Sequence, residues 1–227
     1  MDVDSLLKDA QAQKTKASGL RKRGNVDEAR EILLDVIDDL EHVAQEASDT
    51  FYTSKEWLPV RKVFADTLGM VGGLERRLKH YPESLSWYRK GLKIEDLDKV
   101  STYNFGNEIV LTILSEESRL ESPTVQTALD DLIDRLRKAI DNSNDAKMAA
   151  AVRTEQWWAW SDLGQAYLLK GMFDEALSAY EKGIRETNPS EGDRQSSKNV
   201  LVELGDDLAT LSPEISRSLH AQAARLA

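Results

Sequence analysis

The stretch that most constrains the fold is residues 157–189, WWAWSDLGQAYLLKGMFDEALSAYEKGIRETNP. Its first half places large and small residues on one helical face: Trp160, Leu163, Gly164 and Tyr167. Lys170-Gly171-Met172 then interrupts the pattern. After it, Ala176, Tyr180 and Ile184 recur every four residues until Pro189. The stretch therefore predicts two helices joined by a tight turn.

Small residues on both helices allow a close approach. Gly164 has no side chain and Ala176 a short one, so the neighbouring helix can come near at both positions. Trp160, Tyr167 and Tyr180 fill the space around those contacts. One such hairpin cannot bury its apolar face alone, so the rest of the chain is expected to supply stacked neighbours.

The order of these residues resembles a known family. W-x2-L-G-x2-Y, then A-x3-aromatic, then Pro is the pattern of the tetratricopeptide repeat, with Tyr180 at a position where Phe is commoner. The resemblance implies a helical-repeat protein that binds partners, with the first helix of each hairpin lining a concave groove. It does not name the partner.

Similar pieces recur along the chain. RGNVDEAREILLDVI resembles KGMFDEALSAYEKGI, and YPESLSWYRKGLK aligns without gaps on FDEALSAYEKGIR. We expect one domain over residues 1–227, an all-α right-handed α-α superhelix of about five hairpins: 3–47, 55–95, 101–141, 146–188 and 193–226. Residues 48–53 and 190–196 are predicted as polar loops, and a helix is predicted from Tyr103 to about Leu120.

Repeat spacing departs from the family. The matched small residues Ala29, Ser84, Ala128 (by position only) and Ala176 lie 55, 44 and 48 residues apart, whereas the standard repeat has about 34 residues. The hairpin at 101–141 carries almost none of the family residues. An irregular solenoid is therefore expected.

The composition of the chain limits the kinds of partner that it is expected to bind. The chain has 227 residues, a net charge of −10 and no Cys. The acidic balance argues against nucleic acid and anionic membranes as partners, and the apolar runs are far shorter than a membrane span. The N-terminal residues, MDVDSLLKDAQAQ, do not resemble a secretory signal. We expect a cytoplasmic protein.

No set of residues predicts catalysis or a cofactor. His42 and Glu46 form an i, i+4 pair without further metal ligands at suitable spacing, and a solvated acidic face explains them better. The glycines of Gly69–Gly73 lack the spacing of a phosphate loop and are better explained by close helix packing. The sequence predicts no enzyme, no metal site and no cofactor.

The resemblance also names candidate binding residues. Its groove positions fall on Trp158, Ser161, Asp162 and Gln165 in one hairpin and on Asp66, Gly69, Met70 and Gly73 in another. From these we expect a partner-binding set of Trp158, Asp162, Gln165, Asp66 and Met70. Packing of Trp158 against the preceding helix is the competing explanation. Arg76, Arg77, Lys79 and Arg153 are open to an anionic ligand or to an ordinary solvated face.

Two functions remain open from the sequence. The first is a non-enzymatic module that binds a peptide or partner protein in the groove. The alternative is a regulatory or sensor subunit that clamps a partner enzyme, which the irregular repeats favour. Neither the partner nor the oligomeric state follows from the sequence.

Overall fold

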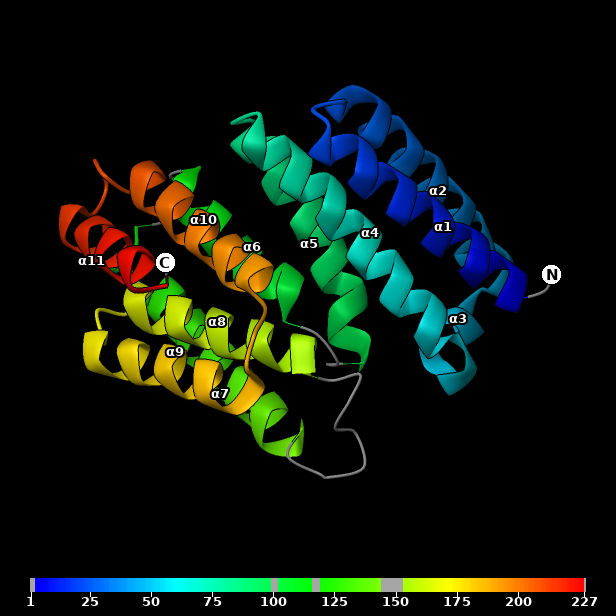
Figure 1. Ribbon diagram of the computed structural model, residues 1–227. Coiled ribbons are helices and arrows are strands. Elements are labelled where there is room, and N and C mark those ends of the chain that lie inside the picture. The colour runs from blue at the N-terminus through cyan, green and yellow to red at the C-terminus, as the bar shows by residue number, and fades with distance from the viewer. Residues whose placement is uncertain (1–2, 99–101, 116–118, 144–152, 227) are drawn as a thin grey trace. The chain divides into compact units, whose positions relative to one another are not determined.

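The computed structural model describes residues 3–98, 102–115, 119–143 and 153–226, and every regular element in those ranges is a helix (Figure 1). The all-α prediction is confirmed. The chain forms two compact units, Met1–Ser115 and Glu116–Ala227, and each is described by itself. The single domain over 1–227 and the handedness of its stack stay predictions.

Unit 1 is arranged around one central helix. Its elements are α1 (Val3–Lys22), α2 (Val26–Ala47), α3 (Asp49–Thr53), a 3-10 turn (Lys55–Trp57), α4 (Leu58–Arg77), α5 (Tyr81–Asp98) and α6 (Tyr103–Leu114). Helix α4 packs against α1, α2, α5 and α6 (Figure 1). Because it has neighbours on several sides, α4 buries residues around much of its circumference, including the charged Arg61, Glu75 and Arg76.

Unit 2 has its own central helix. It contains α7 (Pro123–Ser143), α8 (Arg153–Leu169), α9 (Phe173–Thr187), α10 (Glu191–Asp207) and α11 (Pro213–Arg225). Helix α8 packs against α7, α9, α10 and α11. Trp157 on α8 is 0% exposed and Tyr180 on α9 is 1% exposed, so aromatic rings fill the centre of this unit.

A glycine facing a ring recurs in three hairpins. A Cβ on Gly72 would lie 2.9 Å from the Tyr88 ring, one on Gly164 2.4 Å from the Tyr180 ring, and one on Gly205 2.8 Å from the His220 ring. Ser84 Oγ donates to the Gly72 carbonyl at 2.7 Å, and Ser216 Oγ donates to the Gly205 carbonyl at 2.7 Å. The hairpin of α10 and α11 therefore repeats the same close contact, which its sequence does not make obvious.

Three turns share one backbone conformation. Gly24, Lys79 and Gly171 each lie five residues before the buried small residue of the second helix and have φ of 85°, 62° and 73°. In each turn the next residue donates its backbone N–H to a carbonyl five residues earlier: Asn25 to Leu20, His80 to Glu75 and Met172 to Tyr167. This bond satisfies a carbonyl at the helix end. Lys79 adopts a left-handed conformation that normally favours glycine.

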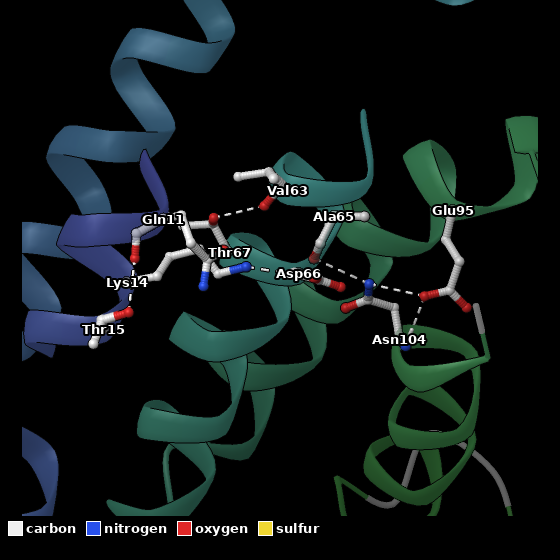
Figure 2. A network of polar contacts seen from close by, with 9 residues as sticks. All are labelled: Gln11, Lys14, Thr15, Val63, Ala65, Asp66, Thr67, Glu95 and Asn104. Atoms are coloured by element: carbon white, nitrogen blue, oxygen red, sulfur yellow. Dashed lines mark hydrogen bonds and ion pairs between the residues drawn. The ribbon is translucent and has the colours of Figure 1, made fainter. Parts of the chain in front are cut away.

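Helix α6 is fixed to unit 1 by a buried polar contact. Glu95 Oε2 accepts from the backbone N–H of Asn104 at 2.9 Å and from its Nδ2 at 3.0 Å, and Asn104 Nδ2 also donates to the Ala65 carbonyl at 3.1 Å (Figure 2). A carboxylate thus sits at the N-terminus of α6, where the helix dipole favours it. Glycines at 69 and 91 make room for Asn104 Oδ1.

Several predicted boundaries were wrong. Residues 49–53 form α3 instead of a loop, because Phe51 is fully buried against the core of unit 1. Residues 191–196 belong to α10, which begins at a capping box between Ser190 and Asp193. Helix α6 ends at Leu114, before the predicted Leu120. The helices of the predicted hairpin 101–141 belong to different units, and the predicted start near Ala146 lies outside the described residues.

Candidate functional site

The predicted residues of unit 1 lie on the side of α4 that meets α1 and α6. Asp66 Oδ2 accepts from Lys14 Nζ of α1 at 3.4 Å, with the Asp66 side chain 38% exposed and that of Lys14 10% exposed (Figure 2). Because Lys14 neutralises it, Asp66 is available to a partner as an ion pair and not as a lone carboxylate. Met70 follows one turn later, half-buried against the core.

The same side of α4 continues beyond Met70. Gly69 lies beneath the ring of Tyr103 on α6. A Cβ on Gly69 would lie 2.6 Å from ring carbon Cε1 of Tyr103. Gly73 and Arg77 follow at helical spacing, and Tyr103 is 41% exposed. Asp66, Met70, Gly73 and Arg77 therefore form one stripe along α4, at intervals of four, three and four residues.

The predicted residues of unit 2 share a stripe on α8. Trp158, Asp162 and Gln165 are spaced by four and three residues and are all half-buried. Trp157 next to them is completely buried, so the two adjacent Trp have different surroundings. The predicted partner-binding set of all five residues stays a prediction, because Asp66 and Met70 belong to unit 1.

Asp162 lies in a less polar environment than the sequence indicates. Loss of solvent raises the pKa of its carboxyl group to about 7. The neighbouring Tyr180 phenol also has its pKa raised, first by burial and then by the Asp162 charge. Next to Asp162, Ser161 Oγ donates to Ser197 Oγ of α10 at 2.9 Å, within the packed interior. Asp162 is therefore partly protonated near neutral pH, which the motif alone does not reveal.

A cavity that the sequence does not predict lies between α7, α8 and α9. It has a volume of about 600 Å³. Its wall and rim include Ile140, Trp160, Leu163, Tyr167, Arg137 and Lys182. Arg137 Nε of α7 donates to Tyr167 Oη of α8 at 2.9 Å. A charged residue therefore contacts this side of the repeat, where a close-packed neighbouring helix is expected. Trp160, predicted as core, is consequently half-buried.

Metal ligands do not gather in the described part of the chain. Within it, no group of three or more His, Cys, Asp or Glu is placed to hold a metal ion. His42 Nε2 lies 3.2 Å from Glu46 Oε1, one turn away on the exposed side of α2. Of the helices in these ranges, none is long and apolar enough to cross a membrane. The predictions of no enzyme and no cofactor remain predictions.

Comparison with solved structures gives similarities at low sequence identity. One is a putative kinesin light chain from Podosopora anserina with nearly identical TPR-like repeats, at 14% identity, 97% coverage of this chain, 95% of that chain and a TM-score of 0.47. Another is BtubC from P. vanneervenii, at 13% identity, 100% and 91% coverage and a TM-score of 0.40. No curated protein matches the chain.

Comparison with family models gives one match, and it falls on the stretch that the sequence singles out. The tetratricopeptide repeat model matches residues 157–188, which are α8 and α9. Those two helices place Gly164 against Tyr180, as the pattern predicts, and also Gly183 against Trp160. The predicted resemblance is confirmed: this is a protein of helical hairpins that carries a tetratricopeptide repeat at residues 157–188.

Proposed function

We propose that the protein is a non-enzymatic module that binds a peptide or a partner protein along the stripes on α4 and α8. The observation that carries the proposal is the tetratricopeptide match of α8 and α9, because repeats of this kind bury one face in the stack and present the other for recognition. A cytoplasmic location and a regulatory role remain predictions.

The chemistry of the stripes suits a peptide. Trp158 offers a large apolar surface, Gln165 offers an amide, and Met70 offers an adaptable apolar side chain. Asp66 with Lys14 adds an ion pair at one end of the α4 stripe. Such mixed surfaces anchor a segment with one or two large side chains and fix its direction with polar groups.

Trp158→Ala tests the proposal. We expect it to weaken partner binding by tenfold or more, since an anchoring Trp typically contributes upward of about 2 kcal/mol. Partners are captured from the native host, identified by mass spectrometry, and their affinity is then measured with purified proteins. A partner bound one to one that resists moderate salt would favour the regulatory alternative.

Leu211→Ala is the matched control, because Leu211 is an exposed apolar residue of unit 2 that lies off the stripe. It should leave affinity unchanged. Thermal unfolding of both variants separates binding from packing. If Trp158→Ala lowers the melting temperature as much as a core substitution does, Trp158 is a packing residue and the proposed stripe on α8 is wrong.

A further inference from the structure

The cavity between α7, α8 and α9 does not share a face of α8 with the proposed binding stripe. On α8 the cavity is lined by Trp160, Leu163 and Tyr167. At about 3.6 residues per turn, this set lies about half a turn around the helix from the stripe at Trp158 and Asp162. A ligand in the cavity would therefore be bound independently of a partner on the stripe.

The inner wall of the cavity is apolar and aromatic. Leu163, Tyr167 and Ala179 are buried there, and Trp160 is half-buried beside them. Trp160 is held close to α9, since a Cβ on Gly183 would lie 2.6 Å from the Trp160 Cβ. Two aromatic side chains thus line a cavity whose volume of about 600 Å³ falls within the range of about 300–1,000 Å³ that is usual for small-molecule sites.

Arg137 of α7 is engaged with one of those rings. Its Nε donates to Tyr167 Oη at 2.9 Å, and its Cζ lies 5.5 Å from the centre of the Tyr167 ring. Both contacts draw the guanidinium toward α8. The positive charge of Arg137 is therefore already used within the protein.

Three carboxylates stand at the rim of the cavity. They belong to Asp141 of α7 and to Asp174 and Glu175 of α9, and all three residues are exposed. Within the described residues none of the three forms an ion pair. The ion pairs in the described part of unit 2 join Arg135 to Asp131, Lys170 to Asp130, Arg185 to Glu186 and His220 to Asp206.

We propose that this cavity is a binding site for a small organic cation, an aromatic ring that carries a protonated amine. The ring would lie against Trp160, Leu163 and Tyr167, which offer apolar and aromatic surface. The ammonium group would point to the rim, where the three carboxylates outweigh the single positive charge that Lys182 adds to that of Arg137. An anionic ligand of the same shape would meet those carboxylates unpaired.

Tryptamine, indole-3-propionate and 3-methylindole test the proposal, because the three probes share one ring system and differ in charge. Each is titrated into the full-length ¹⁵N-labelled protein while NMR follows the indole N–H of Trp160 and the amides of Leu163 and Ala179. We expect saturable shifts at these groups. Tryptamine should bind about tenfold more tightly than indole-3-propionate, a ratio that corresponds to about 1.4 kcal/mol and is within the reach of a few exposed charge pairs.

The combined variant Asp141→Asn, Asp174→Asn and Glu175→Gln should abolish the preference for tryptamine and leave the binding of 3-methylindole unchanged. Persistence of the full tenfold preference in this variant would overturn the role of the rim.

The matched control removes the same charge from exposed residues that do not line the cavity, by Asp134→Asn, Glu181→Gln and Glu214→Gln together. It should keep the preference for tryptamine. Loss of the preference in the control would mean that the net charge of the chain selects the probe, and the proposal would be wrong.

Ala179→Leu fills the cavity and should weaken all three probes about tenfold, with thermal unfolding to show that the variant folds. Failure of every probe to saturate, equal binding of the amine and the acid, or binding that survives Ala179→Leu in the folded variant overturns the proposal. Trp158→Ala should leave tryptamine binding unchanged, so failure of partner capture and failure of the cavity site are separate results.

Discussion

Single glycines set how closely the helices of each hairpin approach. Gly164→Ala should destabilise the protein although alanine favours helix, because its Cβ would lie 2.4 Å from the Tyr180 ring in a packed interior. Overpacking of this kind costs about 1–3 kcal/mol. Gly19→Ala is the control: its Cβ meets only the end of the Arg23 side chain at 3.6 Å, and it should stabilise by about 0.5–1 kcal/mol. Urea unfolding measures both, and equal effects would contradict the packing account.

Asp162 gives a second prediction at this scale. Its pKa is raised from 3.8 to about 7 in the folded protein, so the folded state holds this proton more tightly than the unfolded chain. The stabilisation is fully present below about pH 4 and is lost as the pH rises to about 7, by at most about 1.4 kcal/mol for each pH unit.

Asp162→Asn should remove that dependence. Melting temperatures of the two proteins between pH 4.5 and 8 measure it. The melting temperature of the variant should increase relative to that of the wild type as the pH rises. Parallel curves would mean that the Asp162 carboxyl group is solvated, as the sequence alone suggests for a groove residue.

At the scale of elements, long-range side chains decide where some helices begin. The N-terminus of α6 is held by Glu95 of α5, and Asn104 joins α6 to the backbone of α4. Asn104→Ala leaves the 3%-exposed Glu95 with fewer donors, and should cost about 1–3 kcal/mol. Asn199→Ala, at an exposed position of α10, should cost little. Thermal unfolding compares them, and similar losses would show that the buried contact does not hold α6.

The elements also show why two loops were predicted wrongly. Residues 191–196 are polar, and residues 49–53 carry Asp49, Thr50 and Thr53 beside two aromatic residues, so the prediction of polar loops rested on those polar side chains. One segment is helical because Phe51 is buried in the core of unit 1, and the other because Ser190 and Asp193 cap each other. The Ser-x-x-Asp spacing before the second segment can be read from the sequence. The burial of Phe51 cannot, because it depends on the tertiary structure.

At the scale of the whole molecule, unit 1 contains a complete core. Its apolar cluster draws on residues from Ala10 to Leu74 and is covered by Trp87 and Ile94, all within Met1–Ser115. A fragment of residues 1–115 should therefore fold by itself, with helical circular dichroism and one cooperative unfolding transition. Residues 1–80, which lack α5 and α6, are the control and should unfold gradually. A fragment 1–115 without cooperative unfolding would contradict the division into units.

The sequence by itself determined the hairpin of α8 and α9, since periodicity and small residues are local properties of the chain. The pattern around Trp160, Gly164, Ala176 and Tyr180 correctly predicted α8, α9 and their close contact. It also placed Trp158, Asp162 and Gln165 on one side of α8, and Asp66 and Met70 on one side of α4.

Only the tertiary structure decided what surrounds those residues. Lys14 comes to Asp66 across 52 positions, and Arg137 of α7 faces Tyr167 beside a cavity. Charge balance, burial and cavity shape depend on residues distant in sequence, and no local pattern records which of them will meet.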